Sequence, residues 1–238
     1  MPKPARFSSP QFVPSQRDGL SIAQAVRAWN DFGPQFDGSI GRMAPRGGPL
    51  IRPPTAILIL VNGSAASGKT TLANALAEAL RLPLISKDEL KESLMDSLGC
   101  PDRARSRELG GATYALLYLL MERLLSAGVS LIVDANFSHV VSDREILQVA
   151  GNARIAQVLC QTSDAEVFRR YRERAESGDR HPAHHDTAPE TIADLQTSLA
   201  GNRHQPLDLG APLLVVDTTD GYSPGFEEIV AFARAAMA

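Results

Sequence analysis

The stretch Gly63-Ser64-Ala65-Ala66-Ser67-Gly68-Lys69-Thr70 determines how the rest of this sequence is interpreted. It matches the pattern G-x-x-x-x-G-K-[ST] of a phosphate-binding loop. The apolar segment 56–61 before it predicts a buried strand, and the apolar spacing from Leu72 to Leu80 after it predicts a helix. This strand–loop–helix context separates a phosphate-binding loop from a glycine- and serine-rich turn that matches by chance.

The residue types in this loop suit a bound nucleoside triphosphate. Gly63 and Gly68 let the backbone turn tightly beside a ligand, and the N–H groups between them form an anion-binding nest at the positive end of the helix. We expect Lys69 to reach the β- and γ-phosphates and the Thr70 hydroxyl to bind Mg²⁺. ATP or GTP, with Mg²⁺, is therefore expected to bind Gly63, Ser64, Ala65, Ala66, Ser67, Gly68, Lys69, Thr70 and Thr71.

The composition of the 238-residue chain limits the classes of protein to which it can belong. A hydrophobic content of 44% is ordinary for a globular protein, and a net charge of −3 provides no broad basic surface for nucleic acid. Cys100 and Cys160 lack the spacing of a disulfide framework, which favours free thiols in a reducing compartment. With no apolar run of membrane-spanning length and no secretory pattern, we expect a cytoplasmic protein without a membrane partner.

Residues 1–54 differ in composition from the rest of the chain. They contain nine of the 16 prolines, six of the 18 glycines, and seven Lys or Arg against three Asp or Glu. This composition predicts an irregular Pro/Gly-rich extension, separate from one α/β domain over residues 55–238. A short helix over 20–29 would place Ile22, Val26 and Trp29 on one face, for docking on the domain or for contact with a protein partner. Disorder is the alternative for this segment.

Residues 83–86 predict a second strand, after which Lys87-Asp88-Glu89-Leu90 is expected to begin a helix. Ligands of open α/β sheets collect at the carboxyl ends of the strands. We therefore expect Asp88 to face the phosphate loop as a catalytic base and Lys87 to be a candidate contact for the acceptor substrate. Capping of its helix is the structural alternative for Asp88, and the two roles are compatible.

The strongest helix signal covers residues 107–127, where apolar side chains on two faces predict deep burial. The apolar strand 129–134 follows and ends in Asp134, which resembles a Walker-B aspartate and is expected to bind Mg²⁺. The next residue is Ala135, where ATPases that perform mechanical work commonly have a glutamate that activates water. Its absence favours phosphoryl transfer to a bound acceptor, and Asn136 and Phe137 are candidate contacts for that acceptor.

The loop 177–186 contains Gly, Pro and charged residues and predicts an exposed, mobile lid. Arg180 in this loop is expected to close on the transferring phosphoryl group, where developing negative charge needs a cation.

Two sets of side chains near the lid have a structural and a functional interpretation. The arginines of the preceding predicted helix, 164–176, mostly indicate a solvated basic face, with one or two directed at phosphates: Arg169, Arg170, Arg172 and Arg174. His181, His184 and His185, together with Asp186, resemble metal ligands. However, they share one short run that a proline stiffens, and nothing places a further ligand nearby, so the lid interpretation is preferred.

The remaining segments continue an alternation of strands and helices. A strand is expected over 154–161, a helix that starts with the capping box Thr187-Ala188-Pro189-Glu190, a strand over 212–217 and a closing helix over 225–238. This order predicts a three-layer α/β fold with a five-stranded, mainly parallel sheet.

Five short stretches carry a resemblance to a known group of proteins: Gly63–Thr70, Ile85-Ser86-Lys87-Asp88, Val133-Asp134-Ala135-Asn136, Gly178-Asp179-Arg180 and Val216-Asp217-Thr218. Over residues 55–238 they resemble the P-loop kinases, the group of zeta toxins, chloramphenicol phosphotransferase and the kinase domain of polynucleotide kinase. The resemblance implies a P-loop kinase fold, an ATP or GTP donor with Mg²⁺, and an acceptor hydroxyl. An aspartate after the second strand serves as base in several members, which corresponds to Asp88.

We therefore expect a small-molecule kinase that acts on an antibiotic, a nucleoside or a sugar nucleotide, with Asp88, Lys69 and Arg180 as catalytic residues. A nucleic-acid 5′-hydroxyl kinase is one alternative. The net negative charge of residues 55–238 argues against it, whereas the net positive charge of residues 1–54 is compatible with it. A non-catalytic nucleotide-binding switch, whose residues 1–54 bind a protein partner, is another. Such a switch would need neither Asp88 nor Arg180.

Overall fold

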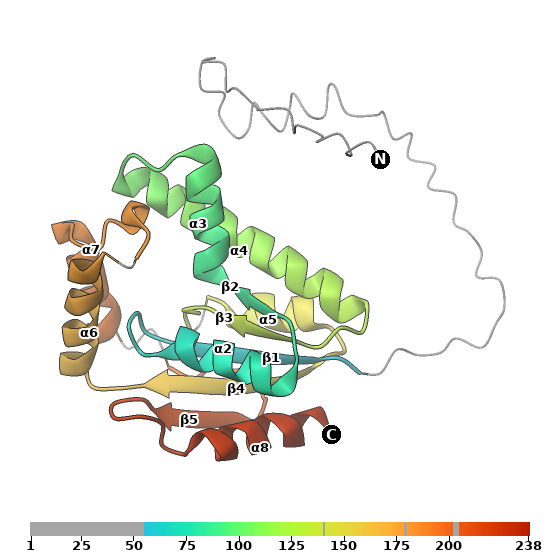
Figure 1. Ribbon diagram of the computed structural model, residues 1–238. Helices are drawn as coiled ribbons and strands as arrows, with labels where there is room; N and C mark the ends of the chain where they lie inside the picture. Colours follow the sequence, from blue (N-terminus) through green and yellow to red (C-terminus); the bar gives the residue numbers. More distant parts are fainter. Residues whose placement is uncertain (1–54, 140, 179, 202–204) are drawn as a thin grey trace, which may run out of the picture. The chain divides into compact units, whose positions relative to one another are not determined.

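The computed structural model describes residues 55–139, 141–178, 180–201 and 205–238. The extension over residues 1–54 and its expected helix lie outside the described residues. The described part folds as a parallel β-sheet with helices on both faces, as shown in Figure 1.

The sheet has the five strands that the sequence predicts. They are β1 (Ile57–Gly63), β2 (Leu84–Ser86), β3 (Leu131–Asp134), β4 (Arg154–Gln161) and β5 (Leu213–Asp217). Their order is β2-β3-β1-β4-β5, and each neighbouring pair is parallel. β2 and β3 lie on one side of β1, and β4 and β5 lie on the other. The connections after neighbouring strands therefore run in opposite directions, and a crevice opens at the carboxyl ends of β1 and β3. The phosphate loop follows β1, and Asp134 ends β3, at this crevice.

Two apolar clusters give the fold its three layers. The central strand β1 is buried on both faces, as its uninterrupted apolar sequence requires. Leu58 and Leu60 belong to the cluster that includes Leu117 and Met121 of helix α4, whereas Ile59 belongs to the opposite cluster. The helices are α2 (Lys69–Leu80), α3 (Lys87–Leu98), α4 (Arg103–Ser126), α5 (Asp143–Ala150), α6 (Asp164–Ser177), the 3₁₀ helix η1 (Pro182–His184), α7 (Pro189–Ala200) and α8 (Phe226–Met237).

Helices α4 and α5 contribute to one cluster, and α2 and α8 to the other. Figure 1 shows that α6 and α7 lie at the end toward which the arrowheads of β4 and β5 point. A third small cluster joins Val167 and Tyr171 of α6 to Leu195 of α7, with Ala65 and Ala66 of the phosphate loop packed against it. Helices α6 and α7 therefore pack directly against the phosphate loop.

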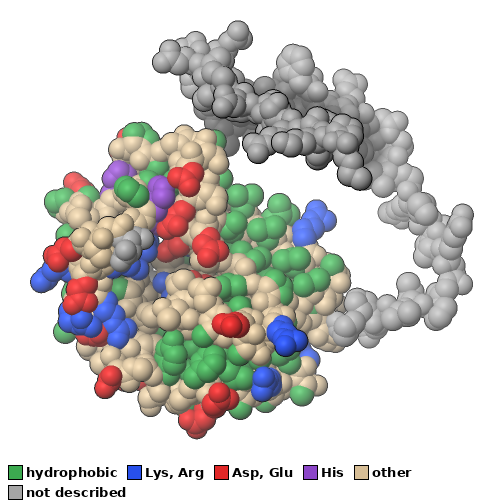
Figure 2. All heavy atoms as spheres, viewed as in Figure 1, with side chains coloured by type: hydrophobic (Ala, Val, Ile, Leu, Met, Phe, Trp, Pro, Cys, Tyr) green, Lys and Arg blue, Asp and Glu red, His purple; other side chains and the backbone are tan. Residues whose placement is uncertain are grey.

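Helix α4 is less deeply buried than the sequence predicts. Its buried residues form one stripe that includes Leu109, Leu117 and Met121. Leu116 and Leu119 are 40% and 46% exposed, and Figure 2 shows hydrophobic side chains gathered over this helix. The buried positions lie about four residues apart, so they cover one face, and the second apolar face remains at the surface of the described residues.

The beginning of α7 differs from the predicted capping box. Ala188 is the N-cap residue and makes no side-chain capping hydrogen bond, so Thr187 does not have the expected role. Pro189 occupies the first helical turn. Backbone N–H groups there have no partner within the helix, so the missing N–H of proline costs no hydrogen bond. Of the helices in the described ranges, none combines the length and the apolar character needed to cross a membrane.

Candidate active site

The phosphate loop adopts a backbone that its glycines make possible. Gly63 has φ 151°, and a Cβ atom there would lie 2.5 Å from Ser67 Oγ and 2.6 Å from the carbonyl oxygen of Cys160. Gly68 has φ 80° and is the N-cap of α2, without a side chain to satisfy the first N–H groups of the helix. Those N–H groups therefore remain for an anion at the positive end of α2.

The side chains of the loop also have unused polar capacity. Lys69 is 8% exposed, and its Nζ donates to the carbonyl oxygen of Ser64 at 3.4 Å, a long hydrogen bond within its own loop. Ser67 Oγ is buried and has no hydrogen-bond partner among the described residues. Thr70 and Thr71 are exposed in the first turn of α2. The geometry therefore suits a polyanion that attracts Lys69 away from Ser64.

The residues predicted to hold Mg²⁺ meet at the end of β3. Thr70 Oγ1 donates to Asp134 Oδ2 at 2.7 Å, and Ser86 Oγ lies 3.4 Å from the same oxygen. Asp134 Oδ1 is buried, and no described group forms a hydrogen bond with it. Burial raises the pKa of Asp134, which the charge of Lys69 and the Thr70 hydrogen bond partly oppose. A carboxylate and a hydroxyl in contact, with one buried oxygen unsatisfied, fit a hard divalent cation.

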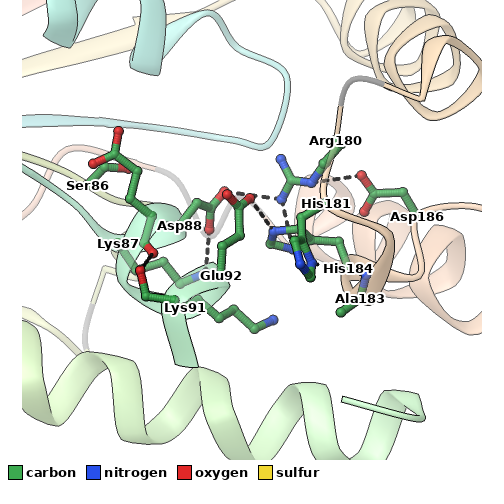
Figure 3. A network of polar contacts seen from close by, with 12 residues as sticks. Ser86, Lys87, Asp88, Lys91, Glu92, Arg180, His181, Ala183, His184 and Asp186 are labelled. Atoms are coloured by element: carbon green, nitrogen blue, oxygen red, sulfur yellow. Dashed lines mark hydrogen bonds and ion pairs between the residues drawn. The ribbon is translucent and has the colours of Figure 1, made fainter. Parts of the chain in front are cut away.

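Asp88 lies in the first turn of α3 and faces the lid, as Figure 3 shows. Its Oδ1 accepts a hydrogen bond from Lys87 at 2.9 Å, and its Oδ2 accepts one from Arg180 at 3.1 Å. Both contacts are with side chains, which does not match a residue whose role is to cap its helix. Burial alone would raise the pKa of Asp88, but Lys87, Lys69 and Arg180 outweigh it and hold the pKa far below its usual value.

The lid loop is attached to α3 by several polar contacts (Figure 3). Arg180 Nε lies 2.9 Å from Asp186 Oδ2, while Arg180 NH2 contacts Asp88. His184 Nε2 lies 2.8 Å from Glu92 Oε1, and its Nδ1 lies 3.1 Å from Arg180. These contacts leave Arg180 and His184 largely covered, so this part of the lid is more enclosed than the sequence predicts.

Two of the three lid histidines, His181 and His184, contact different carboxylates of α3. His181 Nε2 lies 2.9 Å from Asp96 Oδ1, whereas His184 pairs with Glu92. Burial and the charge of Arg180 lower the pKa of His184 to about 3, so this ring is neutral at pH 7. Within the ranges that the structure describes, no group of three or more His, Cys, Asp or Glu side chains could hold a metal ion.

Two of the four arginines of α6 lie near the phosphate loop or the lid. Arg170 NH2 donates to the carbonyl oxygens of Thr218 and Thr219, at 2.6 and 2.9 Å, and Thr218 Oγ1 donates to the Ser67 carbonyl at 2.7 Å. The loop after β5 thus braces the phosphate loop. Arg174 has a buried Nε without a hydrogen-bond partner in the described chain, and its NH2 reaches Asp186 only at 3.9 Å. Arg174 is therefore a second candidate cation for phosphate oxygens.

The candidate acceptor contacts occupy different environments. Lys87, Asn136 and Arg180 line a cavity of about 490 Å³ that also reaches Ala65 of the phosphate loop. The hydroxyl of Tyr114 donates to the Asn136 carbonyl at 2.9 Å and fixes this turn.

Phe137 is fully buried in the core between Tyr114 and Tyr118 and has no surface to offer an acceptor. Its expected role in acceptor binding is therefore wrong, because the chain turns back into the core directly after Asn136.

The cavity also contains cations that the sequence analysis did not single out. Lys91 of α3 and Arg103 and Arg107 of α4 line it. A signal for them was present, because Lys91 follows Lys87 by four residues and Arg107 follows Arg103 by four. That spacing places two side chains on the same face of a helix.

Residues 58–199 match the family described as an AAA domain. The chain belongs to this family. Together with the phosphate loop, the parallel sheet and the lid, this membership makes the described domain that of a P-loop kinase, a transferase type that uses a nucleotide and usually Mg²⁺. No curated protein matches the chain significantly in sequence.

Three solved structures are similar to this chain. A candidate kinase from Chloroflexus aurantiacus is 36% identical, with a TM-score of 0.69, over 76% of this chain and 98% of the other. A sugar kinase from Janibacter sp. is 19% identical, with a TM-score of 0.52, over 78% of this chain and 99% of the other, which shows a shared fold. A gluconokinase from Sinorhizobium meliloti matches over 78% of this chain and 93% of its own, at 22% identity and a TM-score of 0.46.

Proposed function

We propose that this chain transfers the γ-phosphate of ATP, or of GTP, to a hydroxyl group of a small molecule. The observation that carries the proposal is the 3.1 Å contact between Asp88 and Arg180 beside a cavity that reaches the phosphate loop. Phosphoryl transfer needs a cation for the moving group and a carboxylate for the acceptor hydroxyl. Nucleotide binding alone needs neither, which argues against a non-catalytic switch.

The roles of the residues follow from their positions. Lys69 and the first turn of α2 bind the phosphates, and Thr70 and Asp134 are the residues that would hold Mg²⁺, which would neutralise negative charge on the phosphates. Arg180 moves from Asp88 to the transferring phosphoryl group. Arg180 is one of the cations that lower the pKa of Asp88. When Arg180 moves away, the carboxylate of Asp88 therefore becomes more basic, at the stage when it accepts the proton of the acceptor hydroxyl.

The dimensions and charge of the molecule favour a small acceptor over a nucleic-acid end. A cavity of about 490 Å³ is within the usual range for small-molecule sites. A nucleic-acid strand would also need a basic track along its backbone, and the chain carries a net charge of −3.

The direct test is a screen with γ-labelled ATP and GTP. The acceptors are hydroxylated metabolites, nucleosides, sugar nucleotides, antibiotics and a 5′-hydroxyl oligonucleotide. We expect label on a small molecule and none with Lys69→Ala. Label on the oligonucleotide alone would replace this proposal with a nucleic-acid kinase. Tight ATP binding without transfer to any acceptor would favour the switch.

A further inference from the structure

The lining of the cavity is strongly basic. Lys91 extends from α3, and Arg103 and Arg107 extend from the first turns of α4. Five cations line the cavity, and among the described residues three carboxylates pair with members of this set. The cations are Lys87, Lys91, Arg103, Arg107 and Arg180, and the carboxylates are Asp88, Asp186 and Asp194. The cavity therefore has a surplus of positive charge.

Lys91 has the clearest deficit of negative charge. It is 6% exposed, and its Nζ donates to Ser106 Oγ at 2.9 Å. Within the described ranges it has no carboxylate at ion-pair distance. Burial, and then the charge of Lys87, lower the pKa of Lys91 to about 8, and the negative charge of Asp88 opposes this only in part; Lys91 is therefore mostly protonated at pH 7. A buried ammonium without a counter-ion is costly, and a bound anion would remove that cost.

Arg103 and Arg107 have guanidinium N–H donors that their contacts with Asp194 do not use. Both contact the same oxygen, Asp194 Oδ2, at 2.8 and 2.9 Å. Arg103 Nε is buried and has no hydrogen-bond partner among the described residues. A purely structural role, in which Asp194 of α7 is tied to α4, explains these two ion pairs. It explains neither the free Arg103 Nε nor the position of Lys91.

We propose that the acceptor is itself an anion, with a phosphate or carboxylate group that binds Lys91, Arg103 and Arg107. This inference rests on the proposed phosphoryl transfer and specifies the acceptor class. The hydroxyl of such an acceptor faces Asp88, while its charged group binds Lys91, about one turn further along α3, and the two arginines of α4. Guanidinium groups pair with both kinds of anion through charge-assisted hydrogen bonds, and the surplus charge matches a phosphomonoester best. A neutral sugar or neutral antibiotic would leave Lys91 buried without a counter-charge.

The first test compares acceptors that share one skeleton: glucose, gluconate and glucose 6-phosphate, and a nucleoside with its 5′-monophosphate. We expect phosphorylation of the charged members and a KM for them that rises about tenfold or more in Lys91→Met, the loss of one charge-assisted contact. The KM for ATP should stay unchanged. The comparison of gluconate with glucose 6-phosphate separates carboxylate from phosphate. Equal or faster turnover of the neutral member in each set would overturn the proposal.

The second test measures the anion site without any transfer reaction. The phosphate loop is filled with a non-hydrolysable ATP analogue and Mg²⁺, and inorganic phosphate is titrated by calorimetry. We expect saturable binding that weakens about tenfold in Lys91→Met and in Arg107→Gln. The matched control is Arg105→Gln on the same helix, because Arg105 pairs with the exposed Glu108 and does not line the cavity.

The two tests fail in different ways. Unchanged phosphate binding in both Lys91→Met and Arg107→Gln would refute the anion site, even if a neutral acceptor is phosphorylated. Variant-sensitive phosphate binding with no transfer to any acceptor would preserve the site and refute the proposed kinase activity. Melting curves show whether each variant is folded. Lys91→Met removes a buried charge and also the hydrogen bond to the buried Ser106, so its melting temperature should stay close to that of the parent.

Discussion

Substitution of Asp88 by asparagine tests the chemistry most directly, because it preserves the size of the side chain and removes its charge. The carboxylate accepts hydrogen bonds from Lys87 and Arg180, at 2.9 and 3.1 Å. An amide has one acceptor oxygen, so one of these contacts is lost, at a cost of about 1–3 kcal/mol in folding free energy. Arg180 keeps Asp186 at 2.9 Å, so the lid should remain folded.

The effect on turnover should be much larger than the effect on stability. Loss of a positioned base typically lowers the rate by roughly 10²–10⁴-fold, which corresponds to about 3–5 kcal/mol in the activation free energy. Steady-state kinetics with the acceptor from the screen measures kcat, and calorimetry measures ATP affinity, which should stay near that of the parent. Glu89→Gln is the matched control, since Glu89 is the next residue of α3 and is exposed.

Normal turnover of Asp88→Asn would show that Asp88 serves only as an anchor for Lys87 and Arg180. The base would then have to be another group. The next candidates are Asp134 and His139, which lies in the loop between β3 and α5.

Three further substitutions or truncations have defined outcomes. Lys69→Ala should weaken ATP binding in calorimetry and abolish transfer, because the cation that meets the β- and γ-phosphates is lost; unchanged affinity would contradict the whole assignment. Arg180→Ala should lower kcat far more than ATP affinity, because its charge acts chiefly in the transition state; a rate equal to the parent's would exclude Arg180 from catalysis. A variant that begins near Ile51 should fold and bind ATP, because residues 55–238 contain the whole described sheet; insolubility on expression would show that the extension covers part of the domain.

The sequence was sufficient to predict the elements whose signals are local. The phosphate loop, the apolar strands and the aspartates at strand ends need only a short stretch of chain to be recognised. Asp88 and Asp134 could be placed in one site because parallel strands carry their carboxyl ends to the same edge of the sheet. Thr70 and Asp134 are indeed in contact, at 2.7 Å.

The features that were not predicted depend on how distant segments pack. Phe137 lies just after the carboxyl end of a strand, where substrate contacts are common. Its side chain nevertheless enters the core, where it packs against Tyr114 and Tyr118 of α4. The apolar pattern of α4 did not reveal that Leu116 would face outward. The basic wall around Lys91 arises where α3, α4 and α7 meet, and no single stretch of sequence contains all of its residues.

The pairing of the central strand has a consequence for how the protein folds. β1 has no neighbour that is close in sequence: Leu58 pairs with Leu131 in β3, and Gly63 pairs with Cys160 in β4. Such distant parallel pairings form slowly, since a long loop must close before any contact is gained. β1 therefore gains both of its neighbours only after the chain has been made through β4. A nucleotide that binds the folded domain and not the unfolded chain would stabilise the finished fold by mass action.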